Sequence, residues 1–143
     1  MRVNFITLGV RDLDATRAFY VGGLGWSPLL DVPGEVIFFQ VGPGLTLGFY
    51  TGLEGDVGDG VALADPATAP LSLSHNVETD DAVHALMAAA EAAGATVLKP
   101  AQRADFGGFH GYFADPAGFR WEICHNPGWS VAADGTVHIG PAS

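Results

Sequence analysis

A strand end, a helix N-cap and an apolar helix position occur twice in this chain, each time 67 residues apart. The matched pairs are Val10 with Val77, Asp12 with Thr79, and Phe19 with Leu86. Asp and Thr side chains can accept a hydrogen bond from a free N–H group at the start of a helix, and an apolar residue further along marks the face that packs on a sheet. Such a repeat indicates one supersecondary unit used twice, so we expect two modules of similar structure.

Each module is expected to contain one helix among four strands. In the first module, strands are expected at 3–10, around 26–30, at 35–41 and at 45–50, with a helix from 12 to the glycines at 22–23. In the second, a strand at 71–77, a helix at 79–94 and a strand at 95–99 precede a glycine-rich loop at 105–109 and a hairpin at 111–124. Turn-forming Gly and Pro separate the apolar strand patterns. Both modules therefore have the order βαβββ.

The last hairpin turns at Asp115-Pro116-Ala117-Gly118 and carries one acidic residue on its second strand. An Asp side chain can bond the backbone that follows it, Pro presets φ, and Gly supplies the positive φ that closes the turn. The acidic residue, Glu122, lies in an otherwise apolar strand. Because burying an unpaired carboxylate is strongly unfavourable, we expect Glu122 on a wet or functional face.

The pattern Phe-x-Asp-Pro-x-Gly-x-x-Trp-Glu at 113–122 resembles the last hairpin of the vicinal oxygen chelate superfamily, which includes glyoxalase I, fosfomycin and bleomycin resistance proteins, and extradiol dioxygenases. The resemblance implies an α+β fold in which two βαβββ modules form a single cup-shaped mixed sheet. We expect one domain at 1–126, made of module one at 1–52, a linker at 53–70 and module two at 71–126. Residues 127–143 form a C-terminal tail with a small hairpin turned by Asp134-Gly135.

The charge balance excludes several kinds of partner. Sixteen Asp and Glu stand against six Lys and Arg, a formal charge of −10. Such a surface repels phosphate backbones and anionic lipid and would attract a cationic ligand, so we expect no nucleic acid and no membrane partner. No apolar run approaches the roughly 20 residues that span a bilayer, and the first residues lack a signal-peptide pattern, which favours a cytoplasmic location. The single cysteine, Cys124, permits no intrachain disulfide and is expected to be a small buried hydrophobe.

The resemblance also implies a divalent metal, acting as a Lewis acid, held in the cup by side chains from the first and last strands of the modules. The four ligand positions fall on Phe5, on one of Leu47, Gly48 or Phe49, on Ser72, and on Glu122. Only Glu122 is a usual ligand, and a stable site needs three or four protein donors. We therefore expect that a divalent metal is disfavoured as a cofactor.

Two histidines stay open as replacement ligands. His75 has the wrong strand parity to share a face with Ser72 unless the register shifts by one residue. His110 borders the glycine-rich loop and is a candidate ligand or general acid/base, while the alternative is a half-exposed histidine at a strand end. Glu122 and His110 are the candidate catalytic residues.

Arg120 shares strand parity with Glu122. It can form an internal ion pair that replaces a metal, bind an anionic ligand directly, or form a solvated pair on an exposed strand. The predicted ligand-binding residues are Phe5, Thr7, Ser72, Ser74, Tyr112, Arg120 and Glu122. Asn76 is a further polar candidate for the cup wall, and Trp26, Phe38 and Phe109 are aromatic candidates.

Three functions follow from the resemblance and stay open. The first is binding of a small molecule in the cup, with the usual metal site mostly lost. The second is a metal-dependent enzyme, a glyoxalase-type lyase or a dioxygenase, with a rearranged metal site. The third is an antibiotic-sequestering resistance protein, in which the negative charge attracts a cationic compound. A homodimer is expected by analogy.

Overall fold

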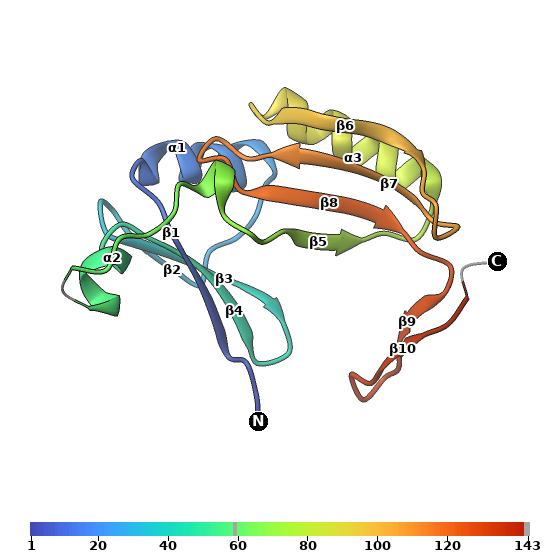
Figure 1. Cartoon of the computed structure of the whole chain (residues 1–143), viewed down its shortest axis with the longest axis horizontal. Coiled ribbons are helices and arrows are strands. Elements are labelled where there is room, and N and C mark those ends of the chain that lie inside the picture. Colours follow the sequence, from blue (N-terminus) through green and yellow to red (C-terminus); the bar gives the residue numbers. More distant parts are fainter. Residues whose placement is uncertain (59, 142–143) are drawn as a thin grey trace.

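Each half of the chain forms its own four-stranded sheet in the computed structural model, which describes residues 1–58 and 60–141 (Figure 1). Asp59 of the expected linker and residues 142–143 of the expected tail lie outside the described residues. The predicted α+β class and the βαβββ order of both modules are confirmed. Within the described residues, no strand pairing joins the two sheets.

The first sheet has the order β1-β4-β3-β2, with β1 parallel to β4 and the other pairs antiparallel. Its strands are β1 (Phe5–Gly9), β2 (Leu30–Val32), β3 (Val36–Gly42) and β4 (Leu45–Tyr50). Helix α1 (Leu13–Arg17) begins after Asp12, whose Oδ1 accepts a hydrogen bond from the Ala15 N–H at 2.9 Å. The predicted N-cap is therefore confirmed.

The structure differs from the sequence interpretation after α1. The helix continues as a π-helix, η1 (Ala18–Gly23), and the strand expected around 26–30 begins at Leu30 instead. Trp26 leaves the sheet because its N–H donates to the Tyr20 carbonyl at 2.9 Å and its ring packs edge-on against Phe39.

The second sheet repeats the plan in the order β5-β8-β7-β6. Its strands are β5 (Leu73–Asn76), β6 (Thr96–Arg103), β7 (Phe109–Ala114) and β8 (Arg120–His125), and α3 (Asp80–Ala92) packs on one face. Thr79 caps α3 as predicted, with its Oγ1 accepting from the Ala82 N–H at 3.0 Å. The expected linker contains two short helices that its composition did not indicate, α2 (Leu53–Val57) and η2 (Pro66–Thr68).

The turn between β7 and β8 forms as the Asp-Pro-x-Gly pattern predicts. Asp115 Oδ1 accepts from the N–H groups of Gly118 and Phe119, both at 2.9 Å. Gly118 has φ +108°, and a Cβ there would lie 2.9 Å from the Ala67 nitrogen. Only glycine fits both this backbone conformation and the close approach of η2.

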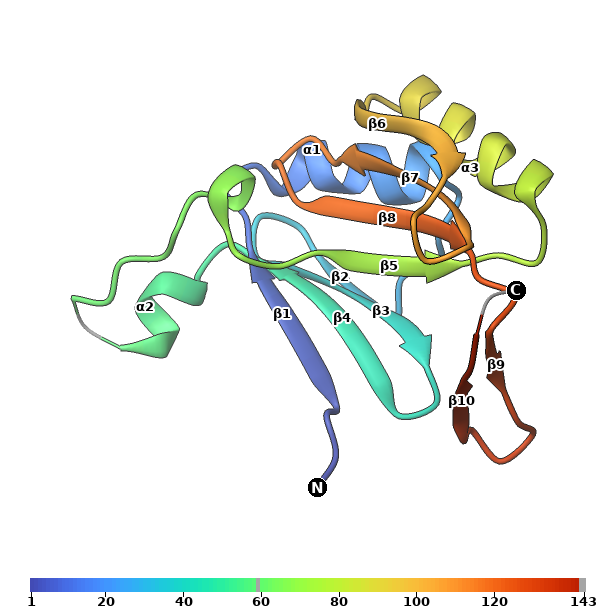
Figure 2. The same cartoon turned by 45° about the vertical axis from the view of Figure 1, so that its right-hand side comes forward.

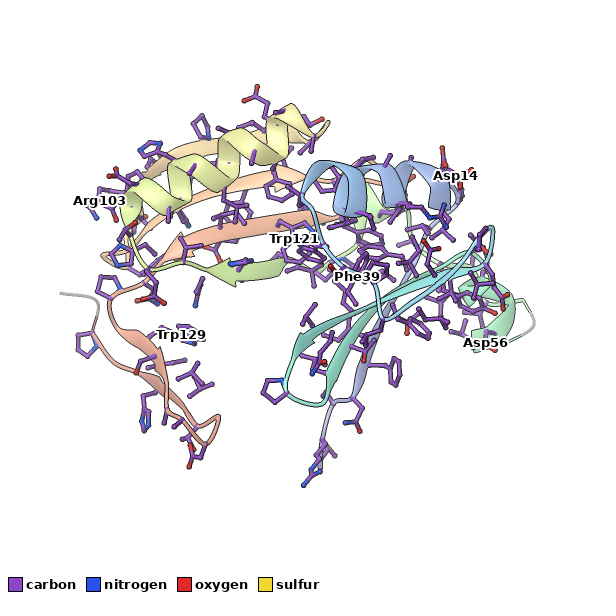
Figure 3. The ribbon with its side chains drawn as sticks, turned by 180° about the vertical axis from the view of Figure 1, so that it is seen from behind. Asp14, Phe39, Asp56, Arg103, Trp121 and Trp129 are labelled. Carbon is purple, nitrogen blue, oxygen red and sulfur yellow. The ribbon has the colours of Figure 1, made fainter. Side chains whose placement is uncertain are left out.

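The helix-bearing faces of the two sheets share one core. Phe49 of the first sheet packs on Tyr20 with ring centroids 4.7 Å apart, and Trp121 of the second sheet lies 6.3 Å from the same ring. Phe39 and Trp121 mark this junction in Figure 3. Because residues of both modules bury one another, neither module closes its core alone.

The last described element is a two-stranded hairpin that projects from the end of β8 (Figure 2). Its strands are β9 (Trp129–Val131) and β10 (Val137–Ile139), and its turn is closed where Asp134 Oδ1 accepts from the Thr136 N–H at 2.9 Å. The predicted tail hairpin is thus confirmed. We call residues 127–141 the C-terminal arm. Across 1–58 and 60–141, no helix is long and apolar enough to cross a membrane.

Candidate functional site

Polar side chains converge on the outer face of the second sheet, the face turned away from α3. Along β8, Trp121 and Ile123 point into the core, so Arg120, Glu122 and Cys124 point outward. The register places Ser74 of β5 and Tyr112 of β7 on either side of Glu122. This part of the predicted site therefore lies on one face.

Glu122 is held by two neighbouring strands. His110 Nδ1 lies 2.8 Å from Glu122 Oε1, and the Ser74 hydroxyl donates to Oε2 at 3.1 Å. A carboxylate only accepts hydrogen bonds, so the His110 nitrogen that faces it carries the proton. Burial and the charge of Glu122 raise the pKa of Tyr112, which keeps that phenol neutral.

The second nitrogen of His110 has no hydrogen-bond partner among the described residues. Its Nε2 is buried, and the His110 side chain is only 10% exposed. The half-exposed ring of Phe106 packs edge-on against the imidazole, with centroids 5.7 Å apart. An unpaired buried nitrogen is unfavourable, so this atom is available to a ligand or a water molecule.

Arg120 is not the partner of Glu122. Its guanidinium donates to the backbone carbonyl of Ala69 in the linker, and the Glu122 carboxylate is paired with His110 instead. The internal Arg120–Glu122 ion pair is therefore wrong, although the shared parity of the two residues is right. Sequence parity placed both on one face but did not indicate that the linker returns to the start of β8.

The predicted residues of the first module lie on the corresponding face of the first sheet. Phe5 packs edge-on against Phe38 at 5.4 Å, and Thr7 pairs with Gly48 of β4. No hydrogen bond, ion pair or ring contact among the described residues joins Phe5 or Thr7 to Glu122. Ser72 is exposed and precedes β5.

A cavity of about 430 Å³ lies beside the free edge of β5. It is lined by Trp26, Ser27, Phe39, Gln40, Val41, Ser74, His75, Asn76 and Trp121. Ser74 joins it to the outer-face group, since this residue lines the cavity while its hydroxyl donates to Glu122. Its size and aromatic walls are typical of small-molecule sites. Of the predicted aromatic lining, Trp26 is in place, whereas Phe38, Phe109 and Tyr112 lie elsewhere.

The residues present do not fit the metal that the fold family implies. Within residues 1–58 and 60–141, no three His, Cys, Asp or Glu side chains lie together. Glu122 has one imidazole neighbour, and the nitrogen that faces it is used in their own hydrogen bond. The remaining family positions supply phenyl, aliphatic or hydroxyl groups, which are poor ligands for a divalent metal.

The other histidines and the cysteine are separate from this group. His75 pairs with Ile123 and so projects from the opposite face to Glu122, as its parity predicted. His84 is exposed on α3, and His125 binds Asp80 Oδ1 at 2.7 Å. Cys124 is buried, and burial beside Glu122 raises the pKa of its thiol to about 11, so it is not a reactive thiolate.

Sequence reasoning missed Phe106 and the cavity residues of β3. Phe106 stands in the glycine-rich loop that was noted only as a loop. A Cβ on Gly108 would lie 2.3 Å from the Phe106 ring, so the glycine permits the contact of Phe106 with His110. Gln40 and Val41 face the cavity because β2 pairs with β3 only as far as Phe38.

Residues 2–123 match the family model described as the Glyoxalase/Bleomycin resistance protein/Dioxygenase superfamily. A glyoxalase-related enzyme from Fulvimarina pelagi is 41% identical, with 98% of this chain and 99% of that chain covered and a TM-score of 0.85. Lactoylglutathione lyase from Agrobacterium tumefaciens is 25% identical, with 87% and 92% covered and a TM-score of 0.63. A glyoxalase/bleomycin resistance protein/dioxygenase from Nocardioides is 23% identical, with 87% and 83% covered and a TM-score of 0.69, which shows the fold alone. No curated protein matches by sequence.

Proposed function

Because the chain belongs to the glyoxalase/bleomycin resistance protein/dioxygenase superfamily, we propose that it binds a small organic molecule in the cavity beside β5, without the usual metal of such folds. The observation that carries this proposal is the position of Ser74, which lines the cavity and donates to Glu122. One residue thus links an aromatic-walled space to a partly buried carboxylate.

The chemistry of the walls selects the ligand. Trp26, Phe39 and Trp121 offer ring faces to a flat or apolar body. The Glu122 carboxylate accepts a hydrogen bond from the lining residue Ser74, while the Arg120 guanidinium is bound to the linker. A neutral or cationic ligand is therefore favoured over an anionic one, which removes direct anion binding by Arg120 from the expected roles.

The test is a thermal-shift screen with neutral and cationic aromatic compounds against small anionic acids, followed by calorimetric titration of any hit. A ligand that binds only the folded protein raises Tm. Val41→Trp fills the cavity from an exposed strand position and should abolish the shift. Ser72→Ala is the matched control, since Ser72 lies outside the cavity and should leave the shift unchanged. A shift that survives Val41→Trp would place the ligand elsewhere.

A metal-dependent lyase or dioxygenase is the second candidate, favoured by the contact between Glu122 and His110, which are both metal-ligand types. It requires a third donor. Metal analysis of protein purified without chelator decides between metal-free binding and a metal-dependent enzyme. A stoichiometric transition metal that is lost in Glu122→Gln would refute the first proposal in favour of the second.

Antibiotic sequestration is a special case of the first proposal, supported by the formal charge of −10. Cationic glycopeptides belong in the same screen, and their binding should weaken as salt screens the charge. We also propose a homodimer, the common assembly for soluble oligomers, and a cytoplasmic location, supported by the single buried cysteine.

A further inference from the structure

The C-terminal arm is an amphipathic ribbon that its own chain leaves uncovered. Trp129 pairs with Ile139 and Val131 with Val137, so these four side chains share one face, while Ser130 and His138 occupy the other. Val131, Val137 and Ile139 are 49%, 52% and 77% exposed. An isolated two-stranded hairpin is only marginally stable in water. Packing the apolar face of the arm against another surface would therefore stabilise it.

Two local hydrogen bonds hold the root of the arm. The Gly128 N–H donates to the Asn126 side chain at 3.0 Å, and the Gly140 N–H donates to the Gly128 carbonyl at 2.7 Å. Among the element pairs in substantial contact in the described chain, β9 and β10 occur only with each other. Figures 1 and 2 show the arm below the end of β8, apart from the first sheet.

A second uncovered surface lies on the outer face of the first sheet. The register of β1, β4 and β3 places Phe5, Thr7, Thr46, Gly48 and Phe38 there, none of them charged. Phe5 is 56% exposed even though it packs on Phe38. The face is uncharged, and the rings of Phe5 and Phe38 give it an aromatic patch beside the hydroxyls of Thr7 and Thr46.

We propose that the arm of one copy packs its apolar face on the outer face of the first sheet of a second copy, and that the contact is reciprocal. This names the surfaces of the homodimer put forward under the proposed function and does not depend on the ligand. A second copy fits because each chain carries both members of the contact, so a two-fold axis makes it twice and closes the assembly.

Charge favours the same pairing. The chain carries a net charge of −10, so two copies repel one another over most of their surfaces. The four apolar arm residues and the five sheet residues are uncharged, which lets this contact form without placing carboxylates against each other. The family match ends at residue 123, so the arm lies beyond the part of the chain that the family model describes.

The test uses cysteines placed on the two surfaces in a Cys124→Ala background. Phe5→Cys and Ile139→Cys proteins are mixed in equal amounts, allowed to exchange, and oxidised mildly. A disulfide-linked heterodimer on a non-reducing gel is the expected result. Leu98→Cys, on exposed β6, replaces Phe5→Cys in the control mixture and should give at least tenfold less product.

Sedimentation of single variants gives the second measurement. Val137→Asp should convert the dimer to a monomer with unchanged circular dichroism, because the arm contributes little to the core of its own chain. Ala133→Asp, at the hairpin turn, should leave the dimer intact.

Three results would overturn the inference. If the wild-type protein is a monomer, both the arm contact and the homodimer are refuted. If the Val137→Asp protein is still a dimer and the Phe5→Cys and Ile139→Cys proteins give no cross-link, the homodimer stands and the arm contact is refuted. An intrachain disulfide in a monomeric Phe5→Cys/Ile139→Cys double variant shows that the arm folds back on its own sheet.

Discussion

The Tyr20 hydroxyl donates to Asp115 Oδ2 at 2.6 Å and so joins residues 95 positions apart in the sequence. Tyr20 stands in η1 of the first module, and Asp115 opens the last turn of the second. The same hydroxyl accepts from Trp121 Nε1 at 2.8 Å, and burial raises the pKa of Tyr20, which keeps its proton in place. Three buried polar groups are thereby satisfied at the junction of the modules.

Replacing Tyr20 by Phe should lower the free energy of unfolding by about 1–3 kcal/mol, because it leaves Asp115 Oδ2 and the Trp121 indole N–H buried and unpaired. Tyr50→Phe is the control, since no described hydrogen bond uses the Tyr50 hydroxyl, and it should change stability by less than about 0.5 kcal/mol. Urea denaturation measures both. Equal losses in the two variants would show that the network contributes nothing.

The pH dependence of stability should report the Asp115 carboxyl. Burial raises its pKa above the ordinary value of 3.8, so the folded state holds this proton more tightly than the unfolded chain. This contribution is therefore present at low pH and is lost as pH rises through the raised pKa. The stability of the wild type relative to Asp115→Asn should be greatest below the ordinary pKa of 3.8 and should fall as pH rises through the raised pKa. A difference that rises with pH would contradict the burial of this carboxyl.

Two adjacent glycines of η1 should respond differently to alanine. A Cβ on Gly23 would lie 2.3 Å from the Ala93 Cβ at the end of α3, whereas a Cβ on Gly22 meets nothing within 4 Å. Gly23→Ala should cost about 1–3 kcal/mol, since helix and neighbour must separate. Gly22→Ala should be neutral or stabilising by up to about 1 kcal/mol. Thermal denaturation of the pair decides, and a neutral Gly23→Ala would refute the close approach.

Glu122 should tolerate glutamine better than alanine. The amide oxygen that Glu122→Gln introduces can still accept the His110 Nδ1 proton, so this variant should change the free energy of unfolding by less than about 1 kcal/mol. Glu122→Ala leaves both imidazole nitrogens without a protein partner and should cost about 1–3 kcal/mol. Ser72→Ala, which removes an exposed hydroxyl outside this hydrogen-bonded group, serves as the control. Equal stability of the glutamine and alanine variants would mean that the contact between Glu122 and His110 contributes nothing to the free energy of unfolding.

Local patterns in the sequence were sufficient for much of the fold. Asp12 and Thr79 act through backbone groups three residues away, and the Asp115 turn closes within four residues. Such signals depend on few neighbours, so they survive in the folded chain. The strand parities of Ser74, Arg120 and Glu122 were also correct, because the alternation of a strand is fixed by its backbone.

What the sequence could not indicate depends on contacts between distant segments. Gly22 and Gly23 were interpreted as the end of a helix, but Gly23 serves the approach of η1 to Ala93, 70 residues later. One alternative for Arg120 was an ion pair with Glu122 on the face they share, whereas its guanidinium donates to the linker carbonyl of Ala69. His110 and Glu122 meet through the pairing of β7 with β8, whose register depends on the length of the intervening turn.

The core that the two modules share bears on how the chain can be divided. Tyr20 has Phe49 on one side and Trp121 on the other, so cutting at the linker would expose aromatic surface on both fragments. Neither half would be an autonomous folding unit, and the two pieces would regain structure only on recombination. Duplication has here produced a repeat whose copies have become mutually obligate.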